Sequence, residues 1–370
     1  MIQRRFPPIQ MRLASPLAVS IPARINILGS PTDAAEGAYA TISCAVPLRG
    51  GARIETASEW VFVREGKSEQ VRASLDGLDL QHDGFELARA AIIALARYSD
   101  EFTAKSRRAG AAIELWTEVP VSSGMGGSSV LLLAVLAGLR AVFDLDRRRH
   151  NDYFLAEVCQ RAEEIELGIT CGFADRYVPL FGGLAYLSYH GKLRHAPLGE
   201  EPYVTYERLD AYAPALTFVV ATTGVARDSG DVHRPMRERY LRERAAGAGL
   251  LLPIARALGA TAWRGKIALL AHDLDEVGRQ ISENHRLVDD MMRRCDYTAG
   301  AGIEANRLIG AAINAGALGA KLTGAGGGGA IFALVRPESA DMVVAALRAA
   351  GAVEVFVLPV EPNGVRVEPA

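Results

Sequence analysis

This sequence has few cysteines and almost no net charge. It has only four cysteines, Cys44, Cys159, Cys171 and Cys295, and no two of them form a C-x-x-C pair. Widely spaced cysteines are typical of packed thiols in a reducing compartment. The 41 Lys and Arg residues nearly balance the 43 Asp and Glu residues, for a formal net charge of -2. This balance gives no general attraction to nucleic acid or to an anionic membrane, so any anion-binding site must be local.

Long apolar runs are missing as well. No segment reaches the roughly 18 uncharged apolar residues that a membrane-spanning helix needs. Residues 1–12 contain no apolar stretch before a small-residue cleavage site, so no secretory signal is predicted. The sequence G-x-x-x-x-G-K-[ST] is also absent, which excludes a P-loop of the Walker type. We therefore expect a cytoplasmic protein that binds neither membranes nor nucleic acid.

What the chain does have is length and an ordinary globular composition. Its 370 residues are 49% hydrophobic and 23% charged, which suits a soluble protein and is too much sequence for one small core. A polar, weakly patterned segment covers residues 190–214. We expect it to separate an N-terminal domain, residues 1–195, from a C-terminal domain, residues 196–370.

Residue patterns predict a mixture of strands and helices. In the first domain they predict strands at 17–28, 38–46, 51–56, 61–64, 111–119 and 184–189, and helices at 85–98, 130–139 and 152–167, the last with Asp152 as its N-cap. In the second domain they predict strands at 217–222, 320–323, 330–335 and 353–360, and helices at 235–258, 266–282, 301–315 and 340–350. The second set fits a helix-covered antiparallel sheet of the split βαβ kind. The expected fold class is α+β.

A glycine- and serine-rich loop at residues 121–129 joins the predicted strand 111–119 to the apolar helix. Glycine lets a backbone approach a ligand closely, and the free N–H groups at a helix start favour anions. The loop is therefore a candidate phosphate cradle. The residues that would form it are Ser122, Ser123, Gly124, Met125, Gly126, Gly127, Ser128 and Ser129.

A second glycine run, residues 324–329, formally contains G-x-G-x-x-G. It is followed by a predicted strand and not by a helix, so a dinucleotide-binding unit is not expected. Two interpretations stay open. The run is either a tight bend between two strands or a second wall of the site that the first loop begins.

Phosphoryl transfer needs a metal near the phosphates, positive charge on the transferred group and a carboxylate beside the acceptor hydroxyl. Ser128 at the helix entrance and Glu163 or Glu164 on the helix 152–167 offer oxygens suited to Mg²⁺. Asp175 and Arg24 lie beside glycine-containing turns. Taken singly, each of these residues more often has a structural role.

Three stretches, in this order and spacing, resemble the motifs of the GHMP small-molecule kinases. Residues 22–33 resemble the first motif, residues 120–129 the second, P-x-x-x-G-L-G-S-S, and residues 321–329 the third. Residues 283–287 resemble a helix common in that family. The resemblance implies that residues 1–195 form an ATP-binding and catalytic domain similar to ribosomal protein S5 domain 2. It implies that residues 196–370 form a ferredoxin-like domain that adds a glycine-rich motif and substrate contacts. ATP and Mg²⁺ are the implied cofactors.

The resemblance also implies roles for single residues. Residues 122–129 would hold the ATP phosphates, with Ser128 and Glu163 as Mg²⁺ ligands and Glu164 as the alternative. Asp175 matches an aspartate proposed as the catalytic base, and Arg24 matches an arginine that neutralises charge near the transferred phosphate. The residues implied at the substrate are Asp33, Arg176, Asp228, Ser229, Gly326 and Gly327.

Differences between this chain and the motifs of related kinases narrow the choice of phosphate acceptor. Galactokinases read G-E-H-T-D where residues 29–33 of this chain read G-S-P-T-D, and mevalonate kinases have lysine in place of Arg24. Gly127 replaces a serine of the usual second motif, which removes a hydroxyl from the cradle. Residues 171–183 and 228–241 resemble the glucuronokinase-like sugar 1-kinases more closely.

An acidic sugar needs a cation, and a guanidinium can bind both carboxylate oxygens. Arg176 and the pair Arg237 and Arg239 are candidates, the alternative being a solvated helix face.

We therefore expect ATP-dependent phosphorylation of the anomeric hydroxyl of a sugar or sugar acid. A glucuronate-type sugar acid is the first candidate acceptor. The alternatives are a heptose-phosphate or isoprenoid-precursor kinase of the same family, or a non-catalytic regulator that binds sugar and ATP. The presence of Ser128, Glu163 and Asp175 argues against the regulator. Both a monomer and a homodimer are compatible with the sequence.

Overall fold

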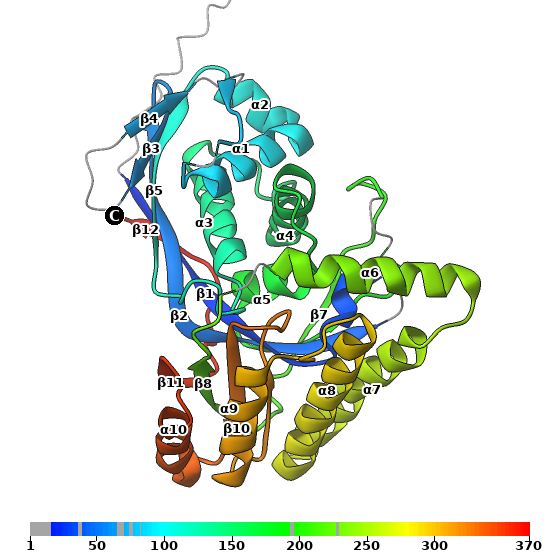
Figure 1. Cartoon of the computed structure of the whole chain (residues 1–370). Helices are drawn as coiled ribbons and strands as arrows, with labels where there is room; N and C mark the ends of the chain where they lie inside the picture. Colours follow the sequence, from blue (N-terminus) through cyan, green and yellow to red (C-terminus); the bar gives the residue numbers. More distant parts are fainter. Residues whose placement is uncertain are drawn as a thin grey trace, which may run out of the picture.

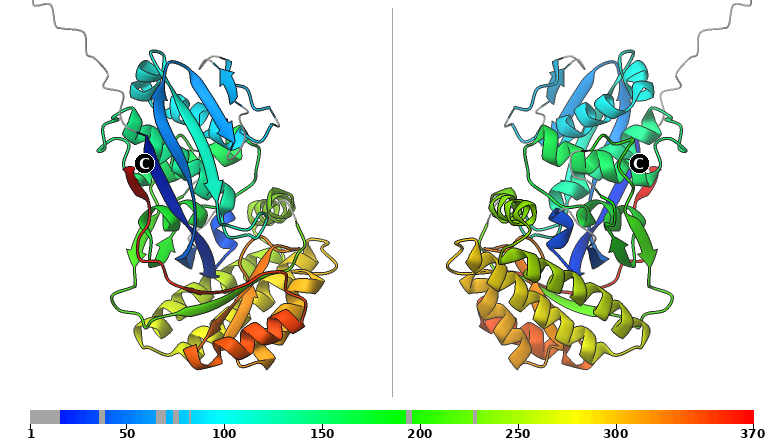
Figure 2. Two further views of the ribbon diagram at one scale, coloured as in Figure 1. Left: turned by 90° about the vertical axis from the view of Figure 1, so that its left-hand side faces the viewer. Right: turned by 90° about the vertical axis from the view of Figure 1, so that its right-hand side faces the viewer.

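Two β-sheets, each covered by helices, form the body of the chain (Figure 1). The computed structural model describes residues 16–35, 39–64, 70–73, 77–81, 83–192, 196–226 and 229–370. The side views show the two sheets with their helices one above the other (Figure 2).

The first sheet follows the order β12-β1-β2-β5-β3-β4, with β6 paired to β2 and β7 paired to β6. All described pairs are antiparallel except β3 with β5. Its strands are β1 (Leu17–Leu28), β2 (Ala40–Ala57), β3 (Trp60–Arg64), β4 (Gln70–Ala73), β5 (Gly110–Thr117), β6 (Leu184–Ser188), β7 (Thr205–Arg208) and β12 (Arg366–Pro369).

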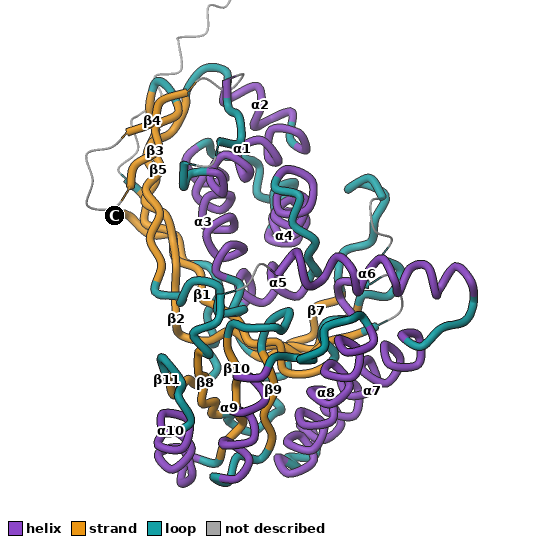
Figure 3. Tube along the Cα trace, in the orientation of Figure 1, coloured by secondary structure: helices purple, strands orange, loops and turns teal. Residues whose placement is uncertain are grey.

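Helices cover one side of this sheet, as the tube drawing shows (Figure 3). They are α1 (Glu86–Tyr98), α2 (Asp100–Ser106), α3 (Gly127–Val142), α4 (Asp152–Arg161), the π-helix η3 (Ala162–Glu166) and α5 (Ala174–Phe181). Helix α3 is the centre of this half, because almost every side chain from Val130 to Leu139 is buried. An apolar surface on all sides requires burial, and α3 packs against β1, β2 and α1.

The second sheet follows the order β11-β8-β10-β9, and all of its pairs are antiparallel. Its strands are β8 (Thr217–Thr222), β9 (Gly319–Leu322), β10 (Ala330–Val335) and β11 (Val355–Pro359). The helices of this half are α6 (Ser229–Ala246), α7 (Leu251–Leu270), α8 (Leu274–Arg294), α9 (Ile303–Asn314) and α10 (Ala340–Ala349). The short 3-10 turns η1 (Thr32–Ala34) and η4 (Pro337–Ser339) complete the described elements.

The α+β architecture expected from the sequence is confirmed, but several elements differ. Residues 40–57 form one strand in place of two, because a register shift between Pro22 and Ala23 lets β2 continue past residues 47–50. The N-cap of α4 is Asn151, whose side chain accepts the N–H of Phe154, and not Asp152.

Other elements were not predicted or were predicted with the wrong bounds. The sequence patterns gave no indication of α2, α5, β7 or β12. The predicted helices 235–258 and 266–282 are wrong in their bounds, since the breaks fall at residues 247–250 and 271–273. The division at residue 195 stays a prediction. Strands β7 and β12 follow it in sequence but pair within the first sheet.

No single described helix is long and apolar enough to cross a bilayer. Residues 230–246 and 251–270 meet that criterion only when they are joined, and they are bent by 108° at the break between them.

The two sheets share a hydrophobic core. One buried cluster contains Ile25 of β1 together with Phe218 of β8, Phe332 of β10 and Ile281 of α8. A buried charge crosses the same boundary, because the Lys321 ammonium on β9 donates to the Asn26 carbonyl of β1 over 3.0 Å. It also donates to its neighbour's carbonyl, Leu322, over 2.8 Å.

Lys321 makes the stability of this junction depend on pH. Burial lowers the pKa of its ammonium from 10.5 to about 7, with a further lowering by the Arg24 charge and an opposing effect of Asp33. Between these two values the unfolded chain holds more protons than the folded chain, so this group makes stability rise with pH, by at most about 1.4 kcal/mol per unit.

We predict that Lys321→Met removes this slope. The unfolding free energy of wild type minus that of the variant should increase by about 2 kcal/mol from pH 7.5 to 9.5, as measured by chemical denaturation. Lys266→Met changes a partly exposed lysine of α7 and is the control. A difference that does not change with pH would contradict the prediction.

Candidate active site

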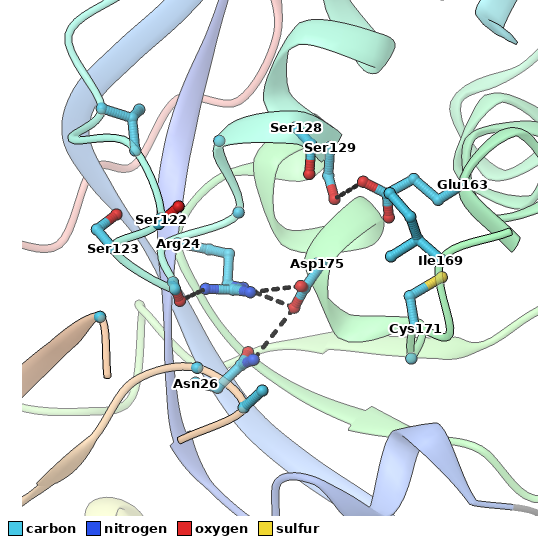
Figure 4. A pocket seen from close by; sticks show the side chains of 18 of the residues that line it. Arg24, Asn26, Ser122, Ser123, Ser128, Ser129, Glu163, Ile169, Cys171 and Asp175 are labelled. Carbon is cyan, nitrogen blue, oxygen red and sulfur yellow. Dashed lines mark hydrogen bonds and ion pairs between the residues drawn. The ribbon is translucent and has the colours of Figure 1, made fainter. Parts of the chain in front are cut away.

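A cavity of about 380 Å³ lies where the two sheets meet, and it is lined by both halves of the chain. Its volume falls within the roughly 300 to 1,000 Å³ that small-molecule sites occupy. The lining comes from β1, η1, the β5–α3 loop, η3, α5, the start of α6 and the β9–β10 loop. Figure 4 shows the polar side chains that face it.

The two glycine runs meet in one wall of this cavity. The backbones of Gly124 and Gly324 come so close that a Cβ on Gly124 would lie 2.9 Å from the Gly324 Cα. Gly124 also has a φ of +72°, which side chains other than glycine rarely adopt. Of the two interpretations of the second run, the structure agrees with the second: the run lines the same cavity as the first glycine loop. Its lining residues are Gly324, Ala325, Gly326, Gly328 and Gly329.

The eight predicted cradle residues do not all face the cavity. Seven of them line it: Ser122, Ser123, Gly124, Gly126, Gly127, Ser128 and Ser129. The Met125 side chain is buried in the core shared by the two sheets, and its carbonyl accepts the backbone N–H of Arg24. In the second run, Gly327 lies outside the lining and donates its N–H to the Ala301 carbonyl over 2.8 Å.

Arg24 and Asp175 form an ion pair beside this wall. Arg24 Nε donates to Asp175 Oδ1 over 2.6 Å, and Nη2 donates to Oδ2. The remaining nitrogen, Nη1, donates to the Gly124 carbonyl over 2.5 Å. Only 3% of Arg24 is exposed, and a charge buried to that degree requires a partner. One guanidinium thus joins strand β1, the first glycine loop and helix α5 (Figure 4).

The environment of Asp175 keeps the carboxylate ionised. Burial alone would raise its pKa, but the Arg24 charge, the hydrogen bonds from Arg24 and a hydrogen bond from Asn26 lower the pKa below 3.8. Asn26 Nδ2 donates to Asp175 Oδ1 over 3.1 Å. Asn26 is held in turn by Ser43, whose hydroxyl donates to Asn26 Oδ1 over 2.8 Å. A carboxylate of low pKa is a weak Brønsted base but a fixed hydrogen-bond acceptor.

Asp33 lies on a second wall, formed by η1 and the loop before α5. Its Oδ2 accepts the backbone N–H groups of Phe173 and Ala174, each over 3.1 Å. These groups open helix α5, which has no cap from its own side chains, so Asp33 serves as that cap from a distant segment. Gly172 is required for this approach, since a Cβ there would meet Asp33 Oδ2 at 2.1 Å.

Glu163 lines the cavity, but protein groups already contact its carboxylate. The Ser129 hydroxyl donates to Oε1 over 3.1 Å, and Arg176 pairs with Oε2. Ser128, the neighbour of Ser129, is exposed and also lines the cavity. Burial lowers the pKa of Arg176 to about 10, which leaves it charged.

These oxygens suit Mg²⁺ only in part. The described residues contain no group of three or more His, Cys, Asp or Glu side chains placed to hold a metal ion. Mg²⁺ takes one or two carboxylates and fills its remaining positions with phosphate oxygens and water. Ser128 and Glu163 therefore fit a metal held mainly by the phosphates of a bound nucleotide, provided that it shares Glu163 with Arg176.

The arginines considered for carboxylate recognition are engaged by the protein. Arg176 is 1% exposed and donates to the Gly172 carbonyl over 2.8 Å besides pairing with Glu163. Arg237 pairs with Glu164 over 2.7 Å. Arg239 donates to Glu243 over 3.1 Å and is absent from the cavity lining.

The sequence also predicts Asp228 and Ser229 at the substrate. Ser229 begins α6, and Asp228 lies outside the described residues.

Asn26 and His233 are among the cavity residues to which sequence reasoning gave no role. Asn26 could have been predicted, because alternate residues of a strand share a face and Asn26 stands two positions after Arg24 on β1. His233 lies in the first turns of α6, and no periodic signal separated it from its neighbours. Burial, helped by the Arg237 charge and opposed by that of Asp175, lowers the pKa of His233 to about 4, so its imidazole is neutral near pH 7.

Comparisons with known proteins agree with this arrangement. Residues 86–183 match the family described as "GHMP kinases N terminal domain", and residues 266–353 match "GHMP kinases C terminal". The mevalonate kinase of Pyrococcus abyssi is 26% identical over 290 residues, 75% of this chain and 76% of that enzyme. Glucuronokinase 1 of Arabidopsis thaliana is 28% identical over 348 residues, 89% of this chain and 88% of that enzyme.

Among solved structures, the fold is similar to that of Lactococcus lactis galactokinase complexed with galactose. The two share 19% sequence identity with a TM-score of 0.72, and the match covers 95% of each chain. Since both family domains match in order and the relatives align over most of the sequence, the chain belongs to the GHMP kinases, a family of small-molecule kinases that use ATP as the phosphate donor.

Proposed function

We propose that the chain phosphorylates the anomeric hydroxyl of a sugar or sugar acid with ATP, with a glucuronate-type acceptor as the first candidate. The observation that carries the proposal is the position of Asp175. Its carboxylate is fixed by Arg24 between the wall of glycines and the wall that contains Asp33. The first wall suits the phosphates of ATP, and the second leaves room for an acceptor beside the carboxylate.

In this arrangement the acceptor hydroxyl donates its hydrogen bond to Asp175. Its oxygen attacks the γ-phosphorus, the bond to the bridging oxygen of ADP breaks, and the hydroxyl proton passes to the carboxylate or on to water. Because the transition state of phosphoryl transfer is loose, a weak base that orients the hydroxyl is sufficient. Arg24 and the amides of the first glycine loop stabilise the negative charge. Mg²⁺, held by Ser128 and Glu163, would supply further charge at the phosphates.

The lengths of the two sequence matches favour a sugar over mevalonate. The match to the glucuronokinase extends over 89% of this chain, whereas that to the mevalonate kinase covers 75%. Arg24 adds to this preference, because mevalonate kinases have a lysine at this position of the first motif.

We predict that D-glucuronate gives the highest kcat/KM in a screen of acceptors with MgATP. The screen follows ADP release with D-glucuronate, D-galactose, L-fucose, a heptose 7-phosphate and mevalonate, and locates the new phosphate by ³¹P NMR. Phosphorylation at the anomeric position supports the proposal. Turnover of mevalonate alone assigns the isoprenoid alternative, and ATP binding without turnover of any acceptor assigns the regulator.

We predict that Asp175→Asn lowers kcat by about 10³-fold, within the range typical of a lost acid–base group, while the affinity for a fluorescent ATP analogue changes only a few-fold. Asp152→Asn is the matched control, since Asp152 also pairs with an arginine, Arg140 over 2.6 Å, away from the cavity. Near-normal turnover of the Asp175 variant would rule out the assigned role.

The metal assignment predicts different effects of two neighbouring glutamates. Glu163→Gln should weaken Mn²⁺ binding to the complex with a non-hydrolysable ATP analogue by about tenfold or more, as measured by calorimetry. Glu164→Gln should not, because Glu164 pairs with Arg237 outside the cavity lining. Glu166→Gln, on the same short helix and paired with Arg97, is the control. The reverse order of effects would move the metal to Glu164.

A further inference from the structure

Helix α6 closes the cavity beside the wall formed by η1 and the loop before α5. His233 is its contribution to the lining, together with Asp33 and Gly172 of that wall. Arg237 stands one turn later on the same helix, and residues four apart share a helix face. Its guanidinium reaches the backbone of the same wall, so His233 and Arg237 both face the segment that leads to Asp175.

Arg237 fixes this helix by hydrogen bonds to three separate segments. Nε donates to the Ala34 carbonyl of η1 over 2.6 Å, and Nη1 donates to Glu164 of η3 over 2.7 Å. Nη2 donates to the Cys171 carbonyl in the loop before α5. Arg237 is 5% exposed, and breaking a charge-assisted bond at a buried site costs more than the bond is worth in water. The helix therefore cannot turn about its axis without losing several of these bonds.

His233 has the chemistry of a substrate contact. Its ring nitrogens have no hydrogen-bond partner in the part of the chain that the structure describes. Burial and the nearby positive charges of Arg237, Arg176 and Arg24 outweigh the attraction of Asp175 and keep the imidazole neutral. A neutral imidazole offers one donor and one acceptor, which matches a hydroxyl group.

We propose that His233 binds the acceptor by a hydrogen bond to a sugar hydroxyl next to the one that Asp175 orients, and that Arg237 is the residue that positions it. This inference rests on the proposed function, because it takes the wall with Asp33 as the acceptor side. It adds a specificity residue that favours acceptors with neighbouring hydroxyls. Arg237 then acts through helix position and not as a partner for a substrate carboxylate.

The first test is kinetic, with D-glucuronate and MgATP. His233→Ala should raise the KM for the acceptor by roughly tenfold or more, the effect of a lost hydrogen bond to a buried group, and leave the KM for ATP within twofold. His233→Asn, which keeps a donor and an acceptor, should recover part of the loss. An unchanged acceptor KM in His233→Ala, or an equal rise in both KM values, overturns the inference.

A second test does not depend on turnover. Diethyl pyrocarbonate modifies neutral, accessible imidazoles, and mass spectrometry reports which histidine reacts. D-glucuronate should protect His233, whereas the non-hydrolysable ATP analogue alone should not. His272, an exposed histidine at the end of α7, is the control and should react equally in all samples. Modification of His233 at the same rate with and without the sugar contradicts the contact.

The role of Arg237 is tested by a double-mutant cycle. Arg237→Lys should raise the acceptor KM, and its effect should largely disappear when His233 is already alanine, because residues that act through one contact are not additive. Fully additive effects would separate the two residues. If wild type phosphorylates none of the screened acceptors, the proposed function itself fails. If wild type is active and the His233 variants behave as wild type, only this inference fails.

Discussion

The ion pair between Arg24 and Asp175 is the interaction on which the site depends. Arg24 is almost wholly buried at the junction of two sheets, where an unpaired charge would be strongly unfavourable. The chain satisfies it with a carboxylate that lies 151 positions away and with the Gly124 carbonyl. Because one guanidinium binds both groups, the glycine loop and helix α5 cannot move apart freely. The constraint that neutralises a buried charge is therefore also the one that assembles the site.

The two walls of the cavity are built on different principles. The glycine wall consists largely of backbone, with Gly124 and Gly324 in direct contact. The opposite wall is held by polar side chains that bind the protein itself, such as Asp33 at the start of α5 and Arg237 across three segments. Under the proposed function, recognition of the acceptor is left to the few groups of this wall that do not bind the protein itself.

The sequence predicted the parts of the site that are local in the chain. Residues 121–129 were identifiable because a glycine-rich turn before an apolar helix has a physical meaning of its own. Arg24, inside strand β1, was identified only because residues 22–33 resemble the first motif of the family. Partners distant in sequence, such as Arg176 for Glu163 or Arg237 for Ala34, leave no local pattern. Helix α5 was missed for a related reason, since Pro179 lies inside it and its cap, Asp33, comes from another element.

Strand β12 has a consequence for how the chain matures. It pairs Leu17–Ser20 of β1 with residues 366–369, so the strand that carries Arg24 gains this edge partner only after the whole second sheet has been synthesised. Contacts between segments so far apart form slowly, because a long loop must close first. The helices around α3 can collapse onto the other strands of the first sheet earlier, yet β1 keeps an open edge until residues 366–369 have been synthesised. Until then the nascent chain is exposed to edge-to-edge aggregation through the strand that carries Arg24.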